Sequence, residues 1–409
     1  MPHNSMWTRV LTISVILFFV YLGDAILSDW VPTFMQGVLG GSMLMGLVFS
    51  FSSVVGFVTD FTFPRFLKKF KPRKLFLMAM GMGLVFAGIL LWTTSWSWVA
   101  LFLLAMAVWG VYYELLWFGS AQFVCDGVPL ESRSGVWGVI GIFKSLAYFL
   151  GPIMGTWLAV SRGNSTVIVM AAAMMCLAYV IWMLTKKSER SYVMEIETEN
   201  NFNVWEEIGH WRVLFVHVWP ALLISLMMGI IDATYWTTGT VMSDNLAKGN
   251  ALGGMFLPLY MLPTIFMGVI LARWGVYKGK KKIAEMFLLV SGGLLICLGL
   301  KENLYVTLLL SFMIGVTLSI SWPMVDAVYT DILARMGRER KHMVGLPSSM
   351  ISLSYVVGPI VAGVIASKVG EKMTFAVIGV MVTVVAAILL LVTPRKLKLP
   401  QAEIAEWKD

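Results

Sequence analysis

Residues 109–157 read WGVYYELLWFGSAQFVCDGVPLESRSGVWGVIGIFKSLAYFLGPIMGTW, two long apolar runs joined by a short polar hairpin. Each run carries one charged residue deep inside it, Glu114 in the first and Lys144 in the second. The segment SLAYFLGPI at residues 145–153 returns as SLSYVVGPI at residues 352–360, an offset of 207. We therefore predict that one six-helix unit occurs twice in the chain.

The composition of the chain is that of a membrane protein. Of its 409 residues, 58% are hydrophobic and 13% charged, and the mean hydropathy is +0.81. A soluble domain cannot cover that much apolar surface, so we expect an all-α protein in a lipid bilayer. Because about 20 apolar residues cross the bilayer core, the sequence predicts twelve spans: 10–31, 42–63, 74–93, 97–121, 134–160, 166–185, 213–243, 250–273, 282–300, 303–330, 342–368 and 372–392.

The basic residues mark one face of the membrane. The net charge is +8, but with a cytoplasmic N-terminus 25 of the 31 Lys and Arg residues fall in inner segments and five in outer loops. This asymmetry follows the positive-inside rule and places both termini in the cytoplasm. We therefore expect a bacterial-type inner or plasma membrane protein with lipid rather than nucleic acid around it.

The predicted domains are a six-helix bundle at 1–185, a cytoplasmic linker at 186–212, and a second six-helix bundle with a short tail at 213–409. The linker is the long polar stretch between spans, and its bland interpretation is a tether. Asn203 followed by Glu206 resembles a helix-capping box. The segment VWEEIGHW at 204–211 is a candidate for a short helix lying on the membrane.

Four ionisable residues lie deep inside predicted spans. Glu114 and Lys144 fall near mid-membrane on consecutive helices, so an ion pair between them is geometrically feasible. Asp24 in GDA and Asp232 in IDA occupy matching places in the two halves, at an offset of 208. An ionised side chain at the bilayer centre costs about 3 kcal/mol or more, so each must face a cavity or a partner. Three acids against one base favour proton or substrate handling; the alternative is a structural acid hydrogen-bonded to Tyr or Ser.

Small residues and proline interrupt one helix in each half. Gly151 and Gly155, four residues apart, give a strip along which another helix can approach closely, and Pro152 loosens the helix there. Gly358 and Pro359 repeat the pattern in the second half. The simpler interpretation is tight packing. The functional one is a bendable contact at the interface between two rocking bundles.

Three groups of residues resemble motifs of the major facilitator superfamily. The first is Gly56, Asp60 and a basic loop at 65–74, and it is partly repeated at Gly268, Arg273 and Gly275. The second is Asp126, Pro129 and Arg133, and the third is Ala147, Gly151, Pro152 and Gly155. The first two groups resemble loops that the family uses for gating, and the third a helix-five motif associated with antiporters. Met106 stands where drug/proton antiporters of the family carry an arginine. The resemblance covers nearly the whole chain and implies two six-helix bundles related by pseudo-two-fold symmetry. Asp326, near an inner helix end, is a further gating candidate that could instead face cytoplasmic water.

Other classes of function find no support in the sequence. No phosphate-binding G-x-x-x-x-G-K-[ST] loop, no H-E-x-x-H and no cysteine spacing for a metal occurs. We therefore expect no enzyme activity, no cofactor and no metal site. The favoured function is a monomeric secondary transporter that moves a small molecule by alternating access, coupled to protons, as an efflux antiporter. Two alternatives remain: proton-coupled uptake of a sugar-like or other polar metabolite, and a receptor or lipid-handling scaffold without turnover.

Overall fold

The computed structural model describes residues 3–67, 70, 72–96, 98–128, 133–185, 204–274, 279–336 and 340–394. Within these residues the regular structure is entirely helical. The first half contains α1 His3–Leu39, α2 Ser42–Leu67, α3 Pro72–Thr93, α4 Val99–Gly127, α5 Arg133–Arg162 and α6 Asn164–Leu184. The second half contains α7 Val204–Thr234, η2 Tyr235–Gly239, α8 Thr240–Gly249, η3 Ala251–Met255, α9 Phe256–Trp274, α10 Lys280–Leu300, α11 Leu304–Met336, α12 Arg340–Val369 and α13 Glu371–Val392.

Eleven helical stretches among the described residues are long and apolar enough to cross a membrane, and Ala251–Met267 is a shorter apolar helix. Together they account for the twelve predicted spans, because α7, η2 and α8 form one continuous crossing and η3 leads into α9. Helices suit this environment because each backbone N–H and C=O finds its partner within the same segment.

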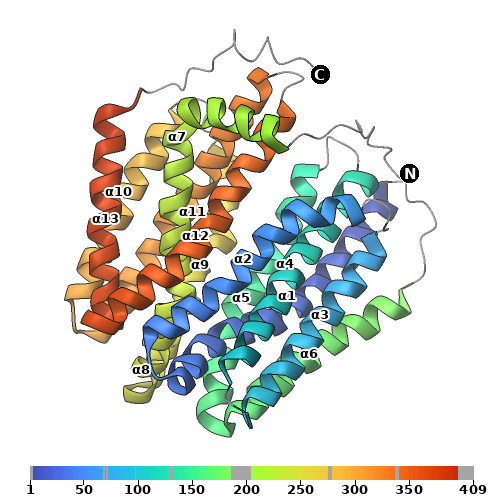
Figure 1. The fold of residues 1–409 in the computed structure, drawn as a ribbon, viewed down its shortest axis with the longest axis vertical. Coiled ribbons are helices and arrows are strands. Elements are labelled where there is room, and N and C mark those ends of the chain that lie inside the picture. Colours follow the sequence, from blue (N-terminus) through green and yellow to red (C-terminus); the bar gives the residue numbers. More distant parts are fainter. Residues whose placement is uncertain are drawn as a thin grey trace.

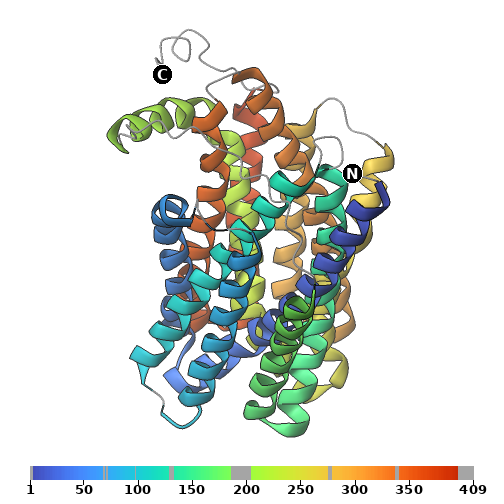
Figure 2. The same cartoon turned by 90° about the vertical axis from the view of Figure 1, so that its right-hand side faces the viewer.

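Each half has its own hydrophobic core. One cluster of buried side chains draws on α1 to α6, and the other on α7 to α13. Trp236 and Val241 of the second half pack into the first cluster, so the cores meet near η2. Figure 2 shows the helices of both halves running side by side along the long axis. The predicted fold, two six-helix bundles, is therefore confirmed.

Helix α1 begins and α13 ends toward the same end of the molecule (Figure 1). We call this the terminal end, and the opposite one the far end. Residues 186–203 of the predicted linker lie outside the described part of the chain. Helix α7 begins at Val204, within the predicted linker, and Figure 1 shows its first turns lying across the terminal end. The candidate helix at 204–211 is therefore helical, as the start of α7, and the predicted boundary between linker and span at residue 213 stays a prediction.

The two halves meet closely at the far end. Helix α2 packs against α12, and a methyl group added at Gly46 would lie 3.0 Å from the carbonyl carbon of Pro359. One at Gly363 would lie 3.2 Å from the carbonyl carbon of Ser42. These approaches need glycine, because a side chain would meet backbone. We call the contacts between the halves at this end the far-end seal.

At the terminal end, each half secures its sixth span with a basic residue from its third. Arg73 of α3 donates hydrogen bonds to the carbonyl oxygens of Thr185 and Trp182 at the end of α6, at 3.1 and 3.2 Å. Lys281 of α10 donates to the Thr393 hydroxyl and, at 3.1 Å, to the carbonyl of Pro394 beyond α13.

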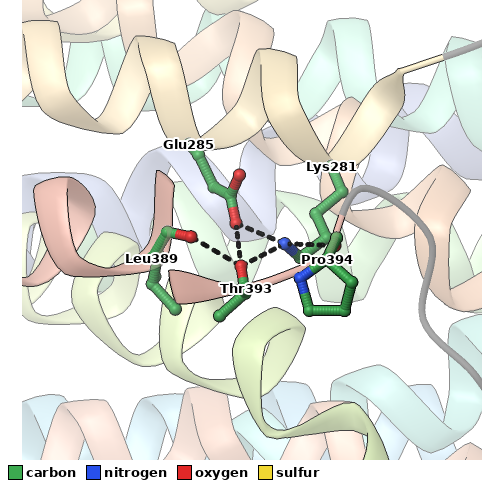
Figure 3. Close-up of polar contacts among 5 residues, drawn as sticks. All are labelled: Lys281, Glu285, Leu389, Thr393 and Pro394. Atoms are coloured by element: carbon green, nitrogen blue, oxygen red, sulfur yellow. Dashed lines mark hydrogen bonds and ion pairs between the residues drawn. The ribbon is translucent and has the colours of Figure 1, made fainter. Parts of the chain in front are cut away.

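We call these contacts of Arg73 and of Lys281 the terminal-end clamps. The clamp in the second half contains an additional acid, Glu285 (Figure 3). Lys281 forms a 2.6 Å ion pair with Glu285, and both side chains are only 4% exposed. The Thr393 hydroxyl lies 3.1 Å from Glu285 Oε1 and 2.6 Å from the carbonyl oxygen of Leu389, two acceptors for its one proton. Arg73 and Lys281 differ by 208 in number, as do Thr185 and Thr393, so the internal repeat extends to these contacts.

Candidate substrate and proton site

A cavity of about 360 Å³ lies between the two halves. Along α2 its lining runs from Phe49 to Gly56, so the cavity begins on the terminal side of the Gly46 contact. The first half contributes Ser52, Trp109, Tyr113, Glu114, Lys144 and Tyr148, among others. The second contributes Asp232, Trp236, Met261, Ile351 and Tyr355, among others. The mixture of aromatic and charged side chains suits an amphipathic small molecule.

Asp24 of α1 is enclosed by hydrogen-bond donors. Its carboxylate accepts from Trp109 Nε1 at 2.8 Å, from the Tyr113 hydroxyl at 3.0 Å and from the Tyr148 hydroxyl at 2.5 Å. The side chain is 0% exposed. Tyr113 and Tyr148 line the cavity, so they separate Asp24 from it. Phe86 stacks on the Trp109 ring at 4.7 Å and fixes that donor.

Asp232 of α7 repeats this arrangement in the second half, with more access to the cavity. It accepts from the Tyr260 hydroxyl of α9 at 2.6 Å and from the Tyr355 hydroxyl of α12. The side chain is half-buried and lines the cavity directly. The Tyr260 ring stacks on Tyr235 at 3.8 Å, which positions this donor.

Tyrosines at matching places in the repeat hold the two acids. Tyr148 lies in SLAYFLGPI and Tyr355 in SLSYVVGPI, and each donates to the aspartate of the first helix in its own half. Neither tyrosine was proposed from the sequence as a site residue. The signal was present, because the tyrosine recurs inside the repeat at an offset of 207.

Lys144 of α5 extends into the cavity beside the two aspartates. Its ammonium lies 5.5 Å from the ring centre of Tyr21 and 5.8 Å from that of Tyr148. Asp24 and Asp232 are the two negative charges that act on it, one from each half. The side chain is exposed, which means that it is open to cavity water.

Glu114 of α4 also lines the cavity, but on the side of α2. Its Oε1 would lie 3.1 Å from a methyl group at Gly56. Among the described residues, ion pairs join Lys280 to Asp331 and Lys281 to Glu285, and none joins Glu114 to Lys144. The predicted Glu114–Lys144 pair is therefore absent from this conformation. The reason is packing: α5 lies against α1, which turns Lys144 toward Tyr21, whereas α4 presents Glu114 to α2.

The glycines of the two proline motifs pack within their own halves. Methyl groups at Gly151 and Gly155 would meet Ala25 and Asp29 of α1, and one at Gly358 would meet Ala233 of α7. The expectation that these glycines contact the opposite half is therefore wrong. The face of α5 that carries Gly151 lies against α1, and the face of α12 that carries Gly358 lies against α7.

The two proline motifs meet the opposite half at different points. Tyr148 of the first motif packs on Trp236 of η2, and Pro359 of the second contacts Gly46 of α2 in the far-end seal. Pro152 lies inside α5, one residue after the glycine that meets α1.

Several predicted gating residues are not placed by the structure. The side chains of Asp60, Asp126, Arg133 and Arg273 lie outside its described part. Asp326 on α11 is exposed and does not belong to the lining of the central cavity. The gating roles of these five residues stay predictions.

A π-helical turn supplies an aromatic group that joins the halves. Tyr235–Gly239 adopts this wider turn in the middle of the seventh span, a feature frequent at functional sites. It directs Trp236 into the cavity, where its ring meets the Tyr148 ring edge-on at 5.3 Å. Trp109 is 2% exposed and donates to Asp24, whereas Trp117 is 55% exposed.

Comparisons with known proteins agree with this architecture. The chain is 22% identical over 384 residues to the multidrug resistance protein MdtG of Enterobacter lignolyticus, covering 92% of this chain and 90% of that protein. It is 21% identical over 270 residues to the staphylopine export protein of Staphylococcus aureus, covering 64% and 66%. A crystal structure of a D-xylose–proton symporter superposes with a TM-score of 0.73 at 12% identity, covering 95% and 98%, which supports the fold alone.

The family model described as the Major Facilitator Superfamily matches residues 2–152 and 221–409. These segments include both aspartate sites, both tyrosines of the repeat and the cavity-lining lysine. The chain therefore belongs to the Major Facilitator Superfamily and is a multi-pass membrane transporter of that family.

Proposed function

We propose that the protein is a proton-coupled exporter of a small amphipathic molecule, with its terminal end in the cytoplasm of a bacterial cell. The positive-inside distribution of Lys and Arg supports this orientation. The names of two relatives, a multidrug resistance protein and a staphylopine export protein, support export. On this proposal, the far-end seal closes the outer side and the cavity receives substrate from the cytoplasm.

The observation that carries the proposal is that Lys144 shares one cavity with aspartates from opposite halves, Asp232 on the cavity wall and Asp24 behind Tyr148. A single ammonium cannot neutralise two carboxylates at once, so one proton is needed for the trio to be neutral. Protonation of one aspartate strengthens the hold of the ammonium on the other. The proton state thereby biases how the halves lie relative to each other, which is the requirement for coupling.

The two aspartates take different parts in this scheme. Asp232 meets the cavity directly, so it exchanges protons with cavity water and lies within reach of a bound substrate. Asp24 lies behind Tyr113 and Tyr148, so a proton reaches it by way of their hydroxyls. Glu114 adds a second cavity-lining carboxylate. A substrate with a cationic group would compete with protons for these acids, and that competition gives antiport.

Proton-coupled uptake of a polar metabolite is the second candidate. It is favoured by the hydroxyls of Ser28, Ser52, Ser53 and Ser352 on the cavity wall and by the three N–H donors of Lys144. These groups suit a neutral or anionic substrate that binds together with a proton.

The direction of proton movement separates the candidates. Purified protein is reconstituted into liposomes that contain the pH dye pyranine, and cationic, zwitterionic, anionic and neutral molecules are added outside one at a time. Antiport makes the lumen more alkaline as substrate enters, whereas symport makes it more acid. A substrate-evoked rise in lumen pH that Asp232→Asn abolishes supports the proposal. A fall supports uptake. If no member of the panel that binds evokes a pH change, a non-transporting receptor or scaffold is the better description.

A further inference from the structure

A second pair of acids lies in the far-end seal, outside the central cavity. Asp29 of α1 is 1% exposed, and its Oδ2 accepts a 3.1 Å hydrogen bond from Thr156 of α5. Thr156 in turn meets η3 of the other half, where a methyl group at Gly254 would lie 3.2 Å from its Cγ2. Asp29 is therefore part of the contact that closes the halves against each other.

One oxygen of this acid lacks a partner. Asp29 Oδ1 is fully buried and makes no hydrogen bond within the described part of the chain. The neighbouring charge that acts on Asp29 is Asp244 of α8, which belongs to the opposite half and is half-buried. The hydroxyl of Thr33 is buried and faces Asp244.

Helices α1 and α8 pack against each other, and the charges of Asp29 and Asp244 repel when both acids are ionised, while the unsatisfied buried oxygen of Asp29 is costly. A single proton reduces both costs, because it removes one charge and supplies an O–H donor where a carboxylate can only accept. Lys248, the cation that acts on Asp244, is exposed and lies one helical turn further along α8. Among the described residues, no other charged group acts on either acid.

We propose that Asp29 and Asp244 form a proton-binding site within the far-end seal, holding one proton between them while the seal is closed. When the halves part, the two acids separate into water. The carboxyl O–H bond then breaks and the proton passes to water on the far side, leaving two carboxylates. The inference rests on the proposed function only in requiring that the seal opens during the cycle.

The site predicts that alkaline pH opens the seal. To test this, spin labels are placed on Ser161→Cys and Glu302→Cys, two exposed far-end positions in opposite halves, with Cys125, Cys176 and Cys297 replaced by serine. Electron–electron distances are measured in lipid nanodiscs, without substrate, at mildly acid and mildly alkaline pH. In the otherwise unchanged protein we expect the fraction with long distances to rise at alkaline pH.

An amide is uncharged and has N–H donors, so it imitates the protonated acid at either position. Asp244→Asn and Asp29→Asn should therefore both hold the short distances at either pH, and Asp244→Glu should restore the response. Glu371→Gln is the matched control. Glu371 is another acid at the far end that contacts the opposite half, but it accepts from the Gln36 amide at 2.9 Å and needs no proton. This variant should keep the response to pH.

The same variants are measured in an Asp24→Asn background, which removes a proton site of the proposed function. A response that persists there and disappears with Asp244→Asn supports the far-end site. A response that survives Asp244→Asn and Asp29→Asn but disappears with Asp24→Asn assigns pH sensing to the central site and overturns this inference, while the proposed function stands. Absence of any response in the unchanged protein also overturns it.

Discussion

The aspartate sites of the two halves share a scaffold but differ in access. Asp24 is held by three donors and is sealed from the cavity, whereas Asp232 is held by two and opens to it. The shared part is the tyrosine of the repeat. The additional donor in the first half is Trp109, which precedes Gly110. The matching residue of the second half, at an offset of 205, is Ile314, which precedes Gly315 and whose side chain cannot donate. A common Asp–Tyr pair therefore holds one acid behind the cavity wall and leaves the other open to the cavity.

The terminal-end clamps diverge in the same way. Arg73 in the first half bonds two backbone carbonyls and lies over the Trp182 ring at 5.5 Å. Lys281 in the second half holds a threonine, a carbonyl and a buried acid. The stabilisation by half-exposed Arg73 depends on the geometry of its hydrogen bonds, whereas the stabilisation by buried Lys281 depends on its ion pair with Glu285. The two halves should therefore respond differently to equivalent substitutions.

The largest expected effect is on coupling. Asp24→Asn and Asp232→Asn should each abolish transport driven by a pH gradient in proteoliposomes, because each removes a proton-carrying group. Only Asp232→Asn should also weaken equilibrium substrate binding, since only Asp232 lines the cavity. Glu302→Gln, at an exposed loop acid, serves as the control. Proton-driven transport that survives in the Asp24→Asn, Glu114→Gln double variant would contradict the assignment of coupling to these acids.

The next effect concerns the buried pair in the second clamp. Lys281→Ala should lower the free energy of unfolding by about 3–5 kcal/mol, because Glu285 is left charged in a buried site. The double variant Lys281→Met, Glu285→Leu should be close to neutral, since it removes both charges and keeps the volume. Thermal unfolding in detergent compares the two. A double variant as unstable as Lys281→Ala would show that packing, not the stranded charge, is responsible.

The sequence predicts the scaffold well and the side-chain partners poorly. Apolar runs and the offset of about 207 give the spans, the two halves and the matched pair Asp24 and Asp232. They do not give the face that each helix presents, because helices apolar on all sides carry no period that orients them. For that reason the sequence makes a Glu114–Lys144 ion pair feasible, although the two side chains face different helices. Asp29 lacks a signal for a different reason: the positions 207 and 208 residues later hold Trp236 and Thr237, so no acid repeats it in the second half.

Packing of the halves gives an effect of intermediate size. Gly151→Leu should destabilise the first half by about 1–3 kcal/mol, because the added side chain overpacks the α1–α5 contact. Gly46→Leu should leave each half stable and instead open the far-end seal, since its neighbours belong to α12 of the other half. Thermal unfolding and far-end spin-label distances separate the two outcomes. Equal loss of stability in both variants would contradict the distinction between contacts within and between halves.

The smallest effect distinguishes the two basic residues of the clamps. Arg73→Lys keeps the charge at the end of α6 but cannot reach both carbonyls with the planar fork of arginine, nor stack as well on Trp182. Loss of one charged hydrogen bond should cost about 1–2 kcal/mol. The reciprocal Lys281→Arg should cost more than Arg73→Lys, because a larger cation must fit a site that is only 4% exposed. Unfolding midpoints of both variants in detergent give the order. If Arg73→Lys lowered the unfolding midpoint more than Lys281→Arg, the hydrogen-bond geometry at Arg73 would matter more for stability than the fit of the cation at residue 281. The expected order of the two clamps would then be reversed.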